Sequence, residues 1–385
     1  MGFDDRLAEG LAALDRETLR RSRRVLDSPQ GARVRVDGRD LANFSSNDYL
    51  GLAADPRLIE AVRRSLDDYG VGAGASPLVS GHLRAHEEAE ARFAAFTGLP
   101  RAILFGSGYA ANLGILTVLA GPEAEVFGDR LNHACLHDGA RLSRATYTRY
   151  PHVDVDALER ALAASRAPVK VVATDAVFSM DGDVAPLPRL LDLCERHDAW
   201  LVVDDAHGIG VVGERGRGSL EHFGIASPRI VYMATLGKAL GGYGAFVAGS
   251  PDAIEWILQR ARTYVFSTAL PPMMAVAASA AVELIEHDRS LLARLRARIA
   301  EFRAACAEAA VPVTPSGTAI QPVIVGDAAR AVEVSARLLE RGFLVPAIRP
   351  PTVPRGTSRL RVSLGAAHER ADVERLARAL AESLA

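Results

Sequence analysis

The chain has very little lysine. Of its 45 basic residues only two are lysines, Lys170 and Lys238, and all the others are arginines. Arginine stays protonated near neutral pH and cannot form a Schiff base, whereas a lysine amine of lowered pKa can. Any lysine chemistry in this protein therefore rests on one of two residues, and rarity alone does not choose between them.

The chain also has few cysteines, a small net charge and no long apolar run. Three cysteines (Cys135, Cys194 and Cys306) are an odd number without metal-ligand spacing, which argues against a disulfide framework and against a metal site. A net charge of −2 gives no electrostatic case for binding nucleic acid or a membrane surface. The acidic, amphipathic N-terminus lacks the apolar core of a signal peptide. We therefore expect a cytoplasmic protein.

The length and the order of apolar runs predict the organisation of the chain. A chain of 385 residues is too long for one ordinary core and suggests a large and a smaller domain. From about 70 to 270, short apolar runs alternate with amphipathic stretches, which is typical of a mostly parallel sheet covered by helices. We predict an N-terminal helical arm and hairpin over 1–45, a large α/β domain over 46–270 and an α+β domain over 271–385.

Several elements are distinct enough to be predicted individually. We expect a helix over 4–26, a hairpin over 34–43 with Asp37 and Gly38 in its turn, and one long helix over 272–309. The glycine-rich stretch 70–81 lacks a strand–GxGxxG–helix arrangement, which excludes a nicotinamide-type site. The clearest strands of the large domain are predicted at 102–105, 125–127, 169–174, 200–204, 230–234 and 244–248.

The segment TLGKALGG (235–242) presents Lys238 on a glycine-rich turn after an apolar strand. Pyridoxal chemistry requires a primary amine that is partly desolvated. A phosphate-binding lysine is the rival interpretation, but the pattern G-x-x-x-x-G-K is absent. A surface lysine in a turn is the ordinary alternative.

The segment WLVVDDAHGIG (200–210) places two carboxylates at the end of another predicted strand. Strand alternation sends Asp204 and Asp205 to opposite faces, so only one can reach a ligand while the other caps a turn. An ionised aspartate against a pyridine nitrogen makes the ring an electron sink, and His207 could donate to its phenolic oxygen. The alternative is that both aspartates cap turns.

Other polar groups recur at strand ends. The segment LFGSGYAANLGIL (104–116) is typical of a strand, a glycine turn and a helix whose N–H groups suit a phosphate. Single side chains at such positions have ordinary alternatives: a lone histidine such as His133 is more often structural, Ser179 and Thr235 are equally plausible as caps, and an exposed arginine is the default for Arg361. The glycine turn, His133, Ser179, the Asp204-x-x-His207 pair and Lys238 follow one another on successive predicted strands of one sheet, which favours one pyridoxal site; Arg361 lies apart, where a predicted strand of the C-terminal domain begins.

The motifs DDAHGIG, TLGKALGG, VFSMDGD and YVFSTALPP resemble those of the α-oxoamine synthase family. The resemblance extends over nearly the whole chain, including NFSSNDYLGL and SGHLRAHEEAE. It implies the aspartate-aminotransferase fold, known as fold type I of the enzymes that use pyridoxal 5'-phosphate (PLP). It also implies a homodimer with shared active sites, which condenses an amino acid with an acyl-CoA thioester and releases CO2.

The same resemblance implies which residues hold the cofactor. Lys238 would carry the Schiff base, Asp204 would pair with the pyridine nitrogen, and His133 would stack on the ring. With His207 these residues would form the catalytic set. Gly108, Tyr109 and Thr235 would hold the phosphate, and Ser267 and Thr268 would reach the phosphate bound in the partner subunit. The full cofactor-binding set would be Gly108, Tyr109, His133, Ser179, Asp204, His207, Thr235, Lys238, Ser267 and Thr268.

The resemblance also implies a substrate-binding set. Asn47 and Arg361 would hold the carboxylate of the amino acid, and the other members would contact the acyl-CoA or its product. Arg20 or Arg23 could replace Arg21, because the spacing of the N-terminal region departs from the family pattern. The set would be Arg21, Asn47, His133, Arg349, Thr352 and Arg361.

Within the family, the segments 347–363 and 319–327 are most similar to members that act in biotin biosynthesis. Those members condense L-alanine with pimeloyl-CoA or with pimeloyl on a carrier protein. An α-oxoamine synthase that uses glycine or serine, such as a glycine C-acetyltransferase, is the nearest alternative. A PLP aminotransferase and a catalytically silent regulator of this fold are further alternatives.

Overall fold

The computed structural model describes residues 2–385, which fall into two compact units. Unit 1 combines the N-terminal residues as far as Asn47 with Met180–Gly182 and Arg294–Ala385. Unit 2 comprises Asp48–Ser179 and Asp183–Ala293. The N-terminal arm therefore belongs to the same unit as the C-terminal part of the chain.

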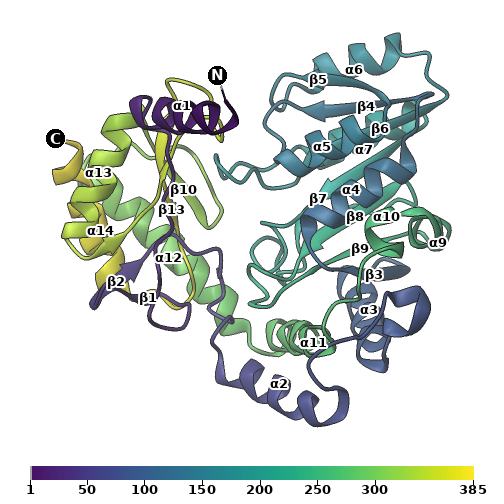
Figure 1. Cartoon of the computed structure of the whole chain (residues 1–385), viewed down its shortest axis with the longest axis horizontal. Coiled ribbons are helices and arrows are strands. Elements are labelled where there is room, and N and C mark those ends of the chain that lie inside the picture. Colours follow the sequence, from purple (N-terminus) through teal and green to yellow (C-terminus); the bar gives the residue numbers. More distant parts are fainter. Residues whose placement is uncertain (1) are drawn as a thin grey trace. The chain divides into compact units, whose positions relative to one another are not determined.

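Unit 2 is built on a seven-stranded sheet with the order β3-β9-β8-β7-β6-β4-β5 (Figure 1). Strand β9 is antiparallel to both of its neighbours, and the other pairs are parallel. The predicted mostly parallel α/β sheet is thus confirmed. The strands are β3 (Arg101–Phe105), β4 (Ala124–Asp129), β5 (Thr146–Tyr150), β6 (Val169–Asp175), β7 (Ala199–Asp204), β8 (Ile230–Thr235) and β9 (Ala245–Gly249).

Helices cover both faces of this sheet. On one face, the Phe246 ring of β9 stacks on Phe93 at 4.3 Å between ring centroids. The next residue, Val247, points to the other face because side chains alternate along a strand. The helices of unit 2 are α2 (Pro56–Tyr69), η1 (Pro77–Gly81), α3 (Arg84–Thr97), α4 (Gly108–Leu119), α5 (Ala134–Leu142), α6 (Val155–Ala164), α7 (Leu187–Arg196), α8 (Ser219–Phe223), α9 (Pro251–Arg260), α10 (Arg262–Val265) and α11 (Pro272–His287).

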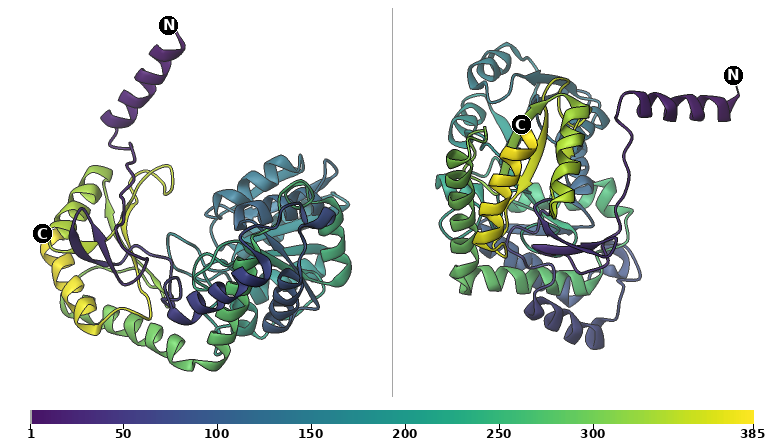
Figure 2. Two further views of the ribbon diagram at one scale, coloured as in Figure 1. Left: turned by 60° about the horizontal axis from the view of Figure 1, so that its bottom comes forward. Right: turned by 90° about the vertical axis from the view of Figure 1, so that its left-hand side faces the viewer.

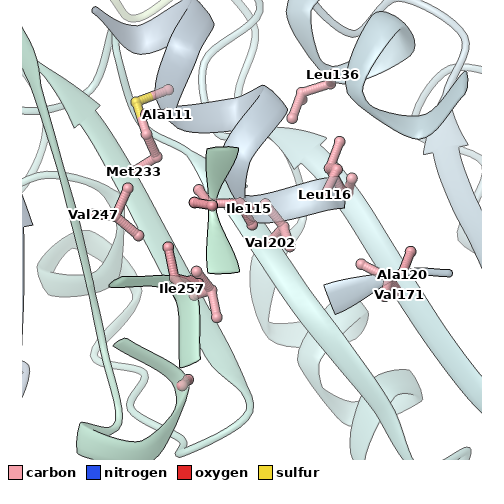
Figure 3. Close-up of a cluster of buried hydrophobic side chains, with 14 of the residues drawn as sticks. Ala111, Ile115, Leu116, Ala120, Leu136, Val171, Val202, Met233, Val247 and Ile257 are labelled. Carbon is pink, nitrogen blue, oxygen red and sulfur yellow. The ribbon is translucent and has the colours of Figure 1, made fainter. Parts of the chain in front are cut away.

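Helix α4 lies at the centre of the main core (Figure 3). It is apolar around most of its circumference, which is typical of a fully buried helix. Ser107 caps its N-terminus, with Oγ accepting a hydrogen bond from the Ala110 amide at 3.1 Å. Ile115 and Leu116 are completely buried in the cluster that also contains Val171, Val202, Met233, Val247 and Ile257. This packing fixes the start of α4 above the sheet.

Unit 1 contains two three-stranded sheets with the orders β1-β2-β11 and β10-β13-β12. The predicted hairpin is confirmed as β1–β2, with Asp37 (φ +49°) and Gly38 (φ +73°) both in the left-handed region that such a turn requires. The strands are β1 (Arg33–Val36), β2 (Arg39–Asn43), β10 (Ile320–Gly326), β11 (Phe343–Leu344), β12 (Ala347–Ile348) and β13 (Ser358–Ser363). The helices are α1 (Phe3–Arg16), α13 (Ala328–Glu340), α14 (Arg370–Leu384) and, from Arg294 onward, α12 (Arg289–Glu308), whose first turn belongs to unit 2.

Two predicted helices differ from the structure. The helix predicted over 4–26 ends at Arg16, and none of its described residues is buried. Figure 2 shows α1 extending away from the two sheets of unit 1. The single helix predicted over 272–309 is interrupted at Asp288, between α11 and α12. Among residues 2–385, no helix has the length and apolarity needed to cross a membrane.

Candidate active site

Lys238 lies in the turn that follows β8 and is half-buried. Its Nζ is 2.7 Å from Nε2 of His207, whose Nδ1 is 2.7 Å from the hydroxyl of Tyr49. His207 and Tyr49 are buried, with 6% and 1% of their surfaces exposed. The lysine amine therefore ends a chain of three hydrogen-bonding side chains that leads into the interior of unit 2.

Asp204 is the last residue of β7 and is 3% exposed. Its Oδ2 accepts a hydrogen bond from Nδ2 of Asn112 at 2.7 Å, and its Oδ1 accepts one from the Ala206 amide at 3.0 Å. Asn112 belongs to α4, so the capped helix and the neighbouring strand hold this carboxylate from two sides. A fixed, buried carboxylate at the C-terminal end of a parallel strand lies where open α/β sheets bind ligands.

Asp205 turns to the other side of the strand end, as the alternation predicts. It is fully buried, and its Oδ2 accepts hydrogen bonds from the Ser219 amide at 2.6 Å and the Tyr232 hydroxyl at 2.8 Å. Burial raises the pKa of Asp205 to about 7, although these hydrogen bonds oppose the shift. Asp205 thus supports the loop after β7, and Asp204 remains on the Lys238 side with Asn112.

His133 lies at the N-terminus of α5 and is exposed. Its Nδ1 is 2.8 Å from Sγ of Cys135, which lies 4.0 Å from Oδ2 of Asp204. Its backbone amide donates to Asp175 at 2.6 Å, and Asp175 is the neighbour of Asp204 in the register of β6 and β7. Desolvation lowers the pKa of His133, which favours the neutral imidazole that can stack on an aromatic ring.

The predicted phosphate-binding residues come together at the start of α4 and the end of β8. A Cβ atom placed on Gly108 would lie 3.9 Å from Cβ of Thr235. The Thr235 hydroxyl donates to the Gly244 carbonyl at 3.0 Å. Tyr109 is 47% exposed and its hydroxyl donates to Asp138 at 2.7 Å. The first amides of α4 and the positive end of its dipole make this a site for an anion.

Three further predicted cofactor residues lie in loops of unit 2. Ser179 is half-buried and follows β6 in a loop closed by the bridge between Val177 and Val184. Ser267 and Thr268 are exposed and follow α10.

In unit 1 the structure pairs Arg361 with Asn47. Arg361 is 5% exposed on β13, and its Nη1 donates to Asn47 Oδ1 at 3.0 Å and to Ser363 Oγ at 2.8 Å. A buried guanidinium held in a fixed orientation is suited to a carboxylate ligand. The two residues predicted to hold the same substrate group are therefore neighbours.

Unit 1 also contains a cavity of about 610 Å³, rich in arginine, which is lined by residues of the N-terminal arm, of α13 and of the segment 346–352. Arg21 Nη2 donates to Thr352 Oγ1 at 2.9 Å, and Arg349 Nη1 donates to the Thr18 carbonyl. Burial and then the charge of Arg21 lower the pKa of Arg349. Arg20 pairs with Asp15 instead. Of the described residues, no carboxylate forms an ion pair with Arg21 or Arg349, which leaves two adjacent cations for an anionic ligand.

Lys170, the other lysine, has a structural setting. It lies in β6, and its Nζ approaches the His197 carbonyl at 3.4 Å. Lys238 lies in a glycine-rich turn after β8 and contacts His207, so it is the candidate for lysine chemistry.

Sequence reasoning missed three residues that shape the site: Tyr49, Asn112 and Cys135. Tyr49 is part of the quoted motif NFSSNDYLGL, but nothing in the motif indicates a contact with His207, 158 residues away. Asn112 offered a weak signal, because a polar residue on an otherwise apolar helix must find a buried partner. Cys135 gave none.

The donor set around Lys238 fits PLP. A buried carboxylate suits a protonated pyridine nitrogen, a primary amine suits an aldehyde, and a helix N-terminus suits a phosphate. Asp204, Lys238 and Gly108 supply these three features within unit 2.

Known proteins are similar to this chain over nearly its whole length. The family described as "Aminotransferase class I and II" matches residues 39–380. An 8-amino-7-oxononanoate synthase from Methylobacillus flagellatus is 57% identical over 97% of this chain and 94% of its own length. One from Aromatoleum aromaticum is 55% identical over 98% and 97%. A solved serine palmitoyltransferase from S. paucimobilis, with a bound PLP–myriocin aldimine, is 29% identical, with a TM-score of 0.92 over 99% of this chain and 97% of its own.

Proposed function

We propose that this chain acts in biotin biosynthesis. It belongs to the class I and II aminotransferase family and, within that family, to the 8-amino-7-oxononanoate synthases. In the proposed reaction, the α-carbon of L-alanine attacks the carbonyl carbon of a pimeloyl thioester. The bond to sulfur breaks and the thiol leaves. The carboxylate of alanine is lost as CO2, a proton is returned to the α-carbon in its place, and the product is 8-amino-7-oxononanoate.

One observation carries the proposal: Lys238 Nζ is 2.7 Å from Nε2 of His207, and the turn that carries Lys238 follows β8, the parallel neighbour of the strand β7 that ends in Asp204. The enzyme is a PLP-dependent acyltransferase, and bound PLP supplies an electron sink that stabilises negative charge at the α-carbon of an amino acid. Asp204 would keep the pyridine nitrogen protonated. Asn112 prevents this carboxylate from turning away, because its amide holds Oδ2 at 2.7 Å.

Lys238 would serve twice, first as the attachment point for the cofactor and then as the general base that removes the α-proton of alanine. A general base must be a free amine within reach of the proton that it removes. His207 is placed to accept or donate a hydrogen bond at Nζ and so to hold the amine in one orientation. His133 would stack on the cofactor ring, and His207 and Ser179 would address the phenolic oxygen side.

Gly108, Tyr109 and Thr235 would hold the cofactor phosphate. In unit 1, Arg361 and Asn47 would bind the carboxylate of alanine, which is an anion matched to a fixed guanidinium. Arg21, Arg349 and Thr352 would bind the acyl substrate or its product. The two adjacent cations are suited to the free carboxylate at the far end of a pimeloyl chain, a group that simple fatty acyl chains lack.

A homodimer with shared active sites completes the proposal. Helix α10 contacts both η1 and α4, and large apolar side chains are exposed on or directly after these elements: Leu78 at 48%, Val79 at 79%, Tyr109 at 47% and Phe266 at 70%. Apolar side chains that gather on one surface usually mark an interface. Ser267 and Thr268 follow Phe266 directly and would reach the phosphate in the partner subunit. The three free, buried cysteines suit the reducing cytoplasm, where we place the enzyme.

The test is a panel of substrates with thiol release and product mass as readouts. Pimeloyl-CoA and pimeloyl carrier protein are each supplied with L-alanine, glycine or L-serine. We expect thiol release and a product of the mass of 8-amino-7-oxononanoate with L-alanine and at least one pimeloyl donor. Heptanoyl-CoA, which lacks the terminal carboxylate, is the matched control for the arginine-rich cavity and should react more slowly.

Other outcomes of the panel would contradict the proposal. Turnover only with glycine or serine, or preference for an acyl chain without a terminal carboxylate, would assign a different α-oxoamine synthase. Transfer of amino groups to 2-oxo acids without thiol release would assign an aminotransferase. Absence of turnover on every pair, by a protein that binds PLP, would favour a silent member of the fold.

A further inference from the structure

We propose that Tyr49 is a positioning residue that orients the His207 ring and keeps the imidazole hydrogen on Nε2, the nitrogen facing Lys238. The inference rests on the proposed function, since it concerns how His207 meets the cofactor attached to Lys238. It adds a residue to the site that neither the motifs nor the strand-end pattern assigns.

The geometry places Tyr49 directly behind His207. The Tyr49 hydroxyl is 2.7 Å from Nδ1, and Lys238 Nζ is 2.7 Å from Nε2 of the same ring. The ring planes of Tyr49 and His207 are tilted by 49°, so the contact is made through the hydroxyl rather than by stacking. Because both side chains are buried, the His207 ring has little freedom to rotate.

The chemistry of imidazole links the two contacts. A neutral imidazole carries one hydrogen, and the hydrogen bond at one nitrogen sets which nitrogen holds it. When the Tyr49 hydroxyl donates to Nδ1, the hydrogen must be on Nε2. His207 then presents a donor to the side where Lys238 lies, which is the arrangement required to stabilise an anionic phenolic oxygen on the cofactor. The opposite arrangement would present a lone pair and repel it.

The position of Tyr49 suits this role. It lies at the end of the segment NFSSNDYLGL, where the Asp48 carboxylate accepts the backbone amides of Leu52 and Ala53 at 2.8 and 3.1 Å. These bonds form a tight turn that fixes the backbone at Tyr49. A buried tyrosine on a fixed turn loses little conformational freedom on holding its hydroxyl in place.

The test is the pH titration of the visible absorbance of the holoenzyme, compared between the wild type and Tyr49→Phe. Tyr49→Phe keeps the buried ring and removes only the hydroxyl. We expect the midpoint of the titration to move to higher pH by about half to one unit, because the anionic oxygen of the cofactor loses a hydrogen bond of ordinary strength. We also expect kcat to fall more than KM rises, since the contact acts on the reacting centre.

The chain offers a matched control, because Tyr147 contacts Nδ1 of His137 through its hydroxyl in the same way. That pair lies on β5 and α5 and includes no lysine. Tyr147→Phe should leave the midpoint unchanged. A Tyr49→Phe and His207→Gln double variant should have the midpoint of His207→Gln alone, because Tyr49 acts through His207.

Two results would overturn the inference: an unshifted midpoint in Tyr49→Phe, even with a lowered Tm, or additive shifts in the double variant. If Tyr49→Phe fails to fold, 3-fluorotyrosine in place of Tyr49 supplies a stronger donor of nearly the same shape. The midpoint should then move to lower pH, and an unchanged midpoint would again contradict the role. If the wild type itself shows no lysine-bound cofactor absorbance, the proposed function fails instead, so the two failures are distinguishable.

Discussion

At the scale of single residues, Asp204 and Asp205 show how strand alternation separates two identical side chains. One carboxylate faces Asn112 and the other faces Ser219 and Tyr232, as the alternation predicts. The partners themselves could not be predicted, because they come from segments distant in sequence. The same holds for Tyr49, whose contact with His207 joins residues 158 positions apart. Periodicity predicts the face on which a side chain lies but not the side chain that it meets there.

These settings predict different results for two otherwise equal substitutions. Asp204→Asn should lower kcat by about 100-fold or more, because an uncharged amide cannot hold a proton on the pyridine nitrogen. Asp205→Asn should still bind the cofactor, since the amide oxygen can accept the hydrogen bonds from Ser219 and Tyr232. Kinetics and cofactor absorbance of the two variants check this. Equal activity in both would contradict the assignment of Asp204.

The raised pKa of Asp205 also predicts a dependence of stability on pH. Its pKa is 3.8 when unfolded and about 7 in the folded protein, so the folded state binds a proton more tightly. Its contribution to stability is therefore full below pH 3.8 and is lost as the pH rises to about 7. Asn cannot ionise and does not lose this stability. The unfolding free energy of Asp205→Asn minus that of the wild type should therefore increase as the pH rises through this range. A flat difference would show that Asp205 is ionised in the folded protein.

At the scale of elements, the strands and most helices could be predicted, and helix ends could not. Apolar periodicity continues across Asp288, so the sequence predicts one helix where α11 and α12 are separate. The break is explained by contacts of the Asp288 carboxylate with the Ser290 amide at 3.2 Å and with Arg57 at 3.1 Å. Helix α1 ends early because Thr18 adopts a left-handed conformation with φ +57°. Both causes depend on individual side chains or backbone angles, which periodicity does not contain.

His152 connects two loops of unit 2 and gives a prediction at this scale. Its Nδ1 is 3.0 Å from Asp129 and its Nε2 is 2.8 Å from Asp183, which follows the loop that carries Ser179. Burial alone would lower the pKa of His152, but the two carboxylates raise it to about 10. The stability that it contributes is therefore full below pH 6.5 and is lost as the pH rises through about 10.

His152→Gln should lower Tm at pH 7 by about 2 to 6 °C and remove this part of the pH dependence. Thermal unfolding between pH 6 and 10 measures both effects. The control is His82→Gln, which breaks an exposed pair with Glu87 of similar length, 2.9 Å, and should change Tm little. An equal response of both variants would show that the loops are held by other contacts.

At the scale of the whole molecule, the type I fold could be predicted because its motifs occur in order along the whole chain. In the folded chain, the N-terminal residues as far as Asn47 form one unit with Arg294–Ala385. Local sequence patterns do not predict this grouping, because the two segments are far apart in the chain. Subunit association likewise leaves no periodic signal. Exposed apolar residues such as Phe266 support it in the structure, and the proposed dimer makes a prediction that mixing experiments can check.

If each active site uses Lys238 of one subunit and Ser267 and Thr268 of its partner, two inactive variants should complement each other. Lys238→Ala and the double variant Ser267→Ala and Thr268→Ala are unfolded, mixed and refolded together. Half of the dimers formed at random are hybrids, and each hybrid has one intact site, so roughly a quarter of wild-type activity should return. No recovery in mixed dimers, verified by mass, would show that each site is built within one subunit.

The central claim is that Lys238 carries the cofactor, and the scarcity of lysine makes it directly measurable. The holoenzyme is reduced with borohydride, digested and analysed by mass spectrometry, with Lys238→Arg as the matched variant. We predict the mass of a phosphopyridoxyl group on the peptide that contains Lys238 and an unmodified peptide that contains Lys170, the only other lysine. In Lys238→Arg the modification should disappear. A modified Lys170, or a modification that survives in Lys238→Arg, would contradict the account.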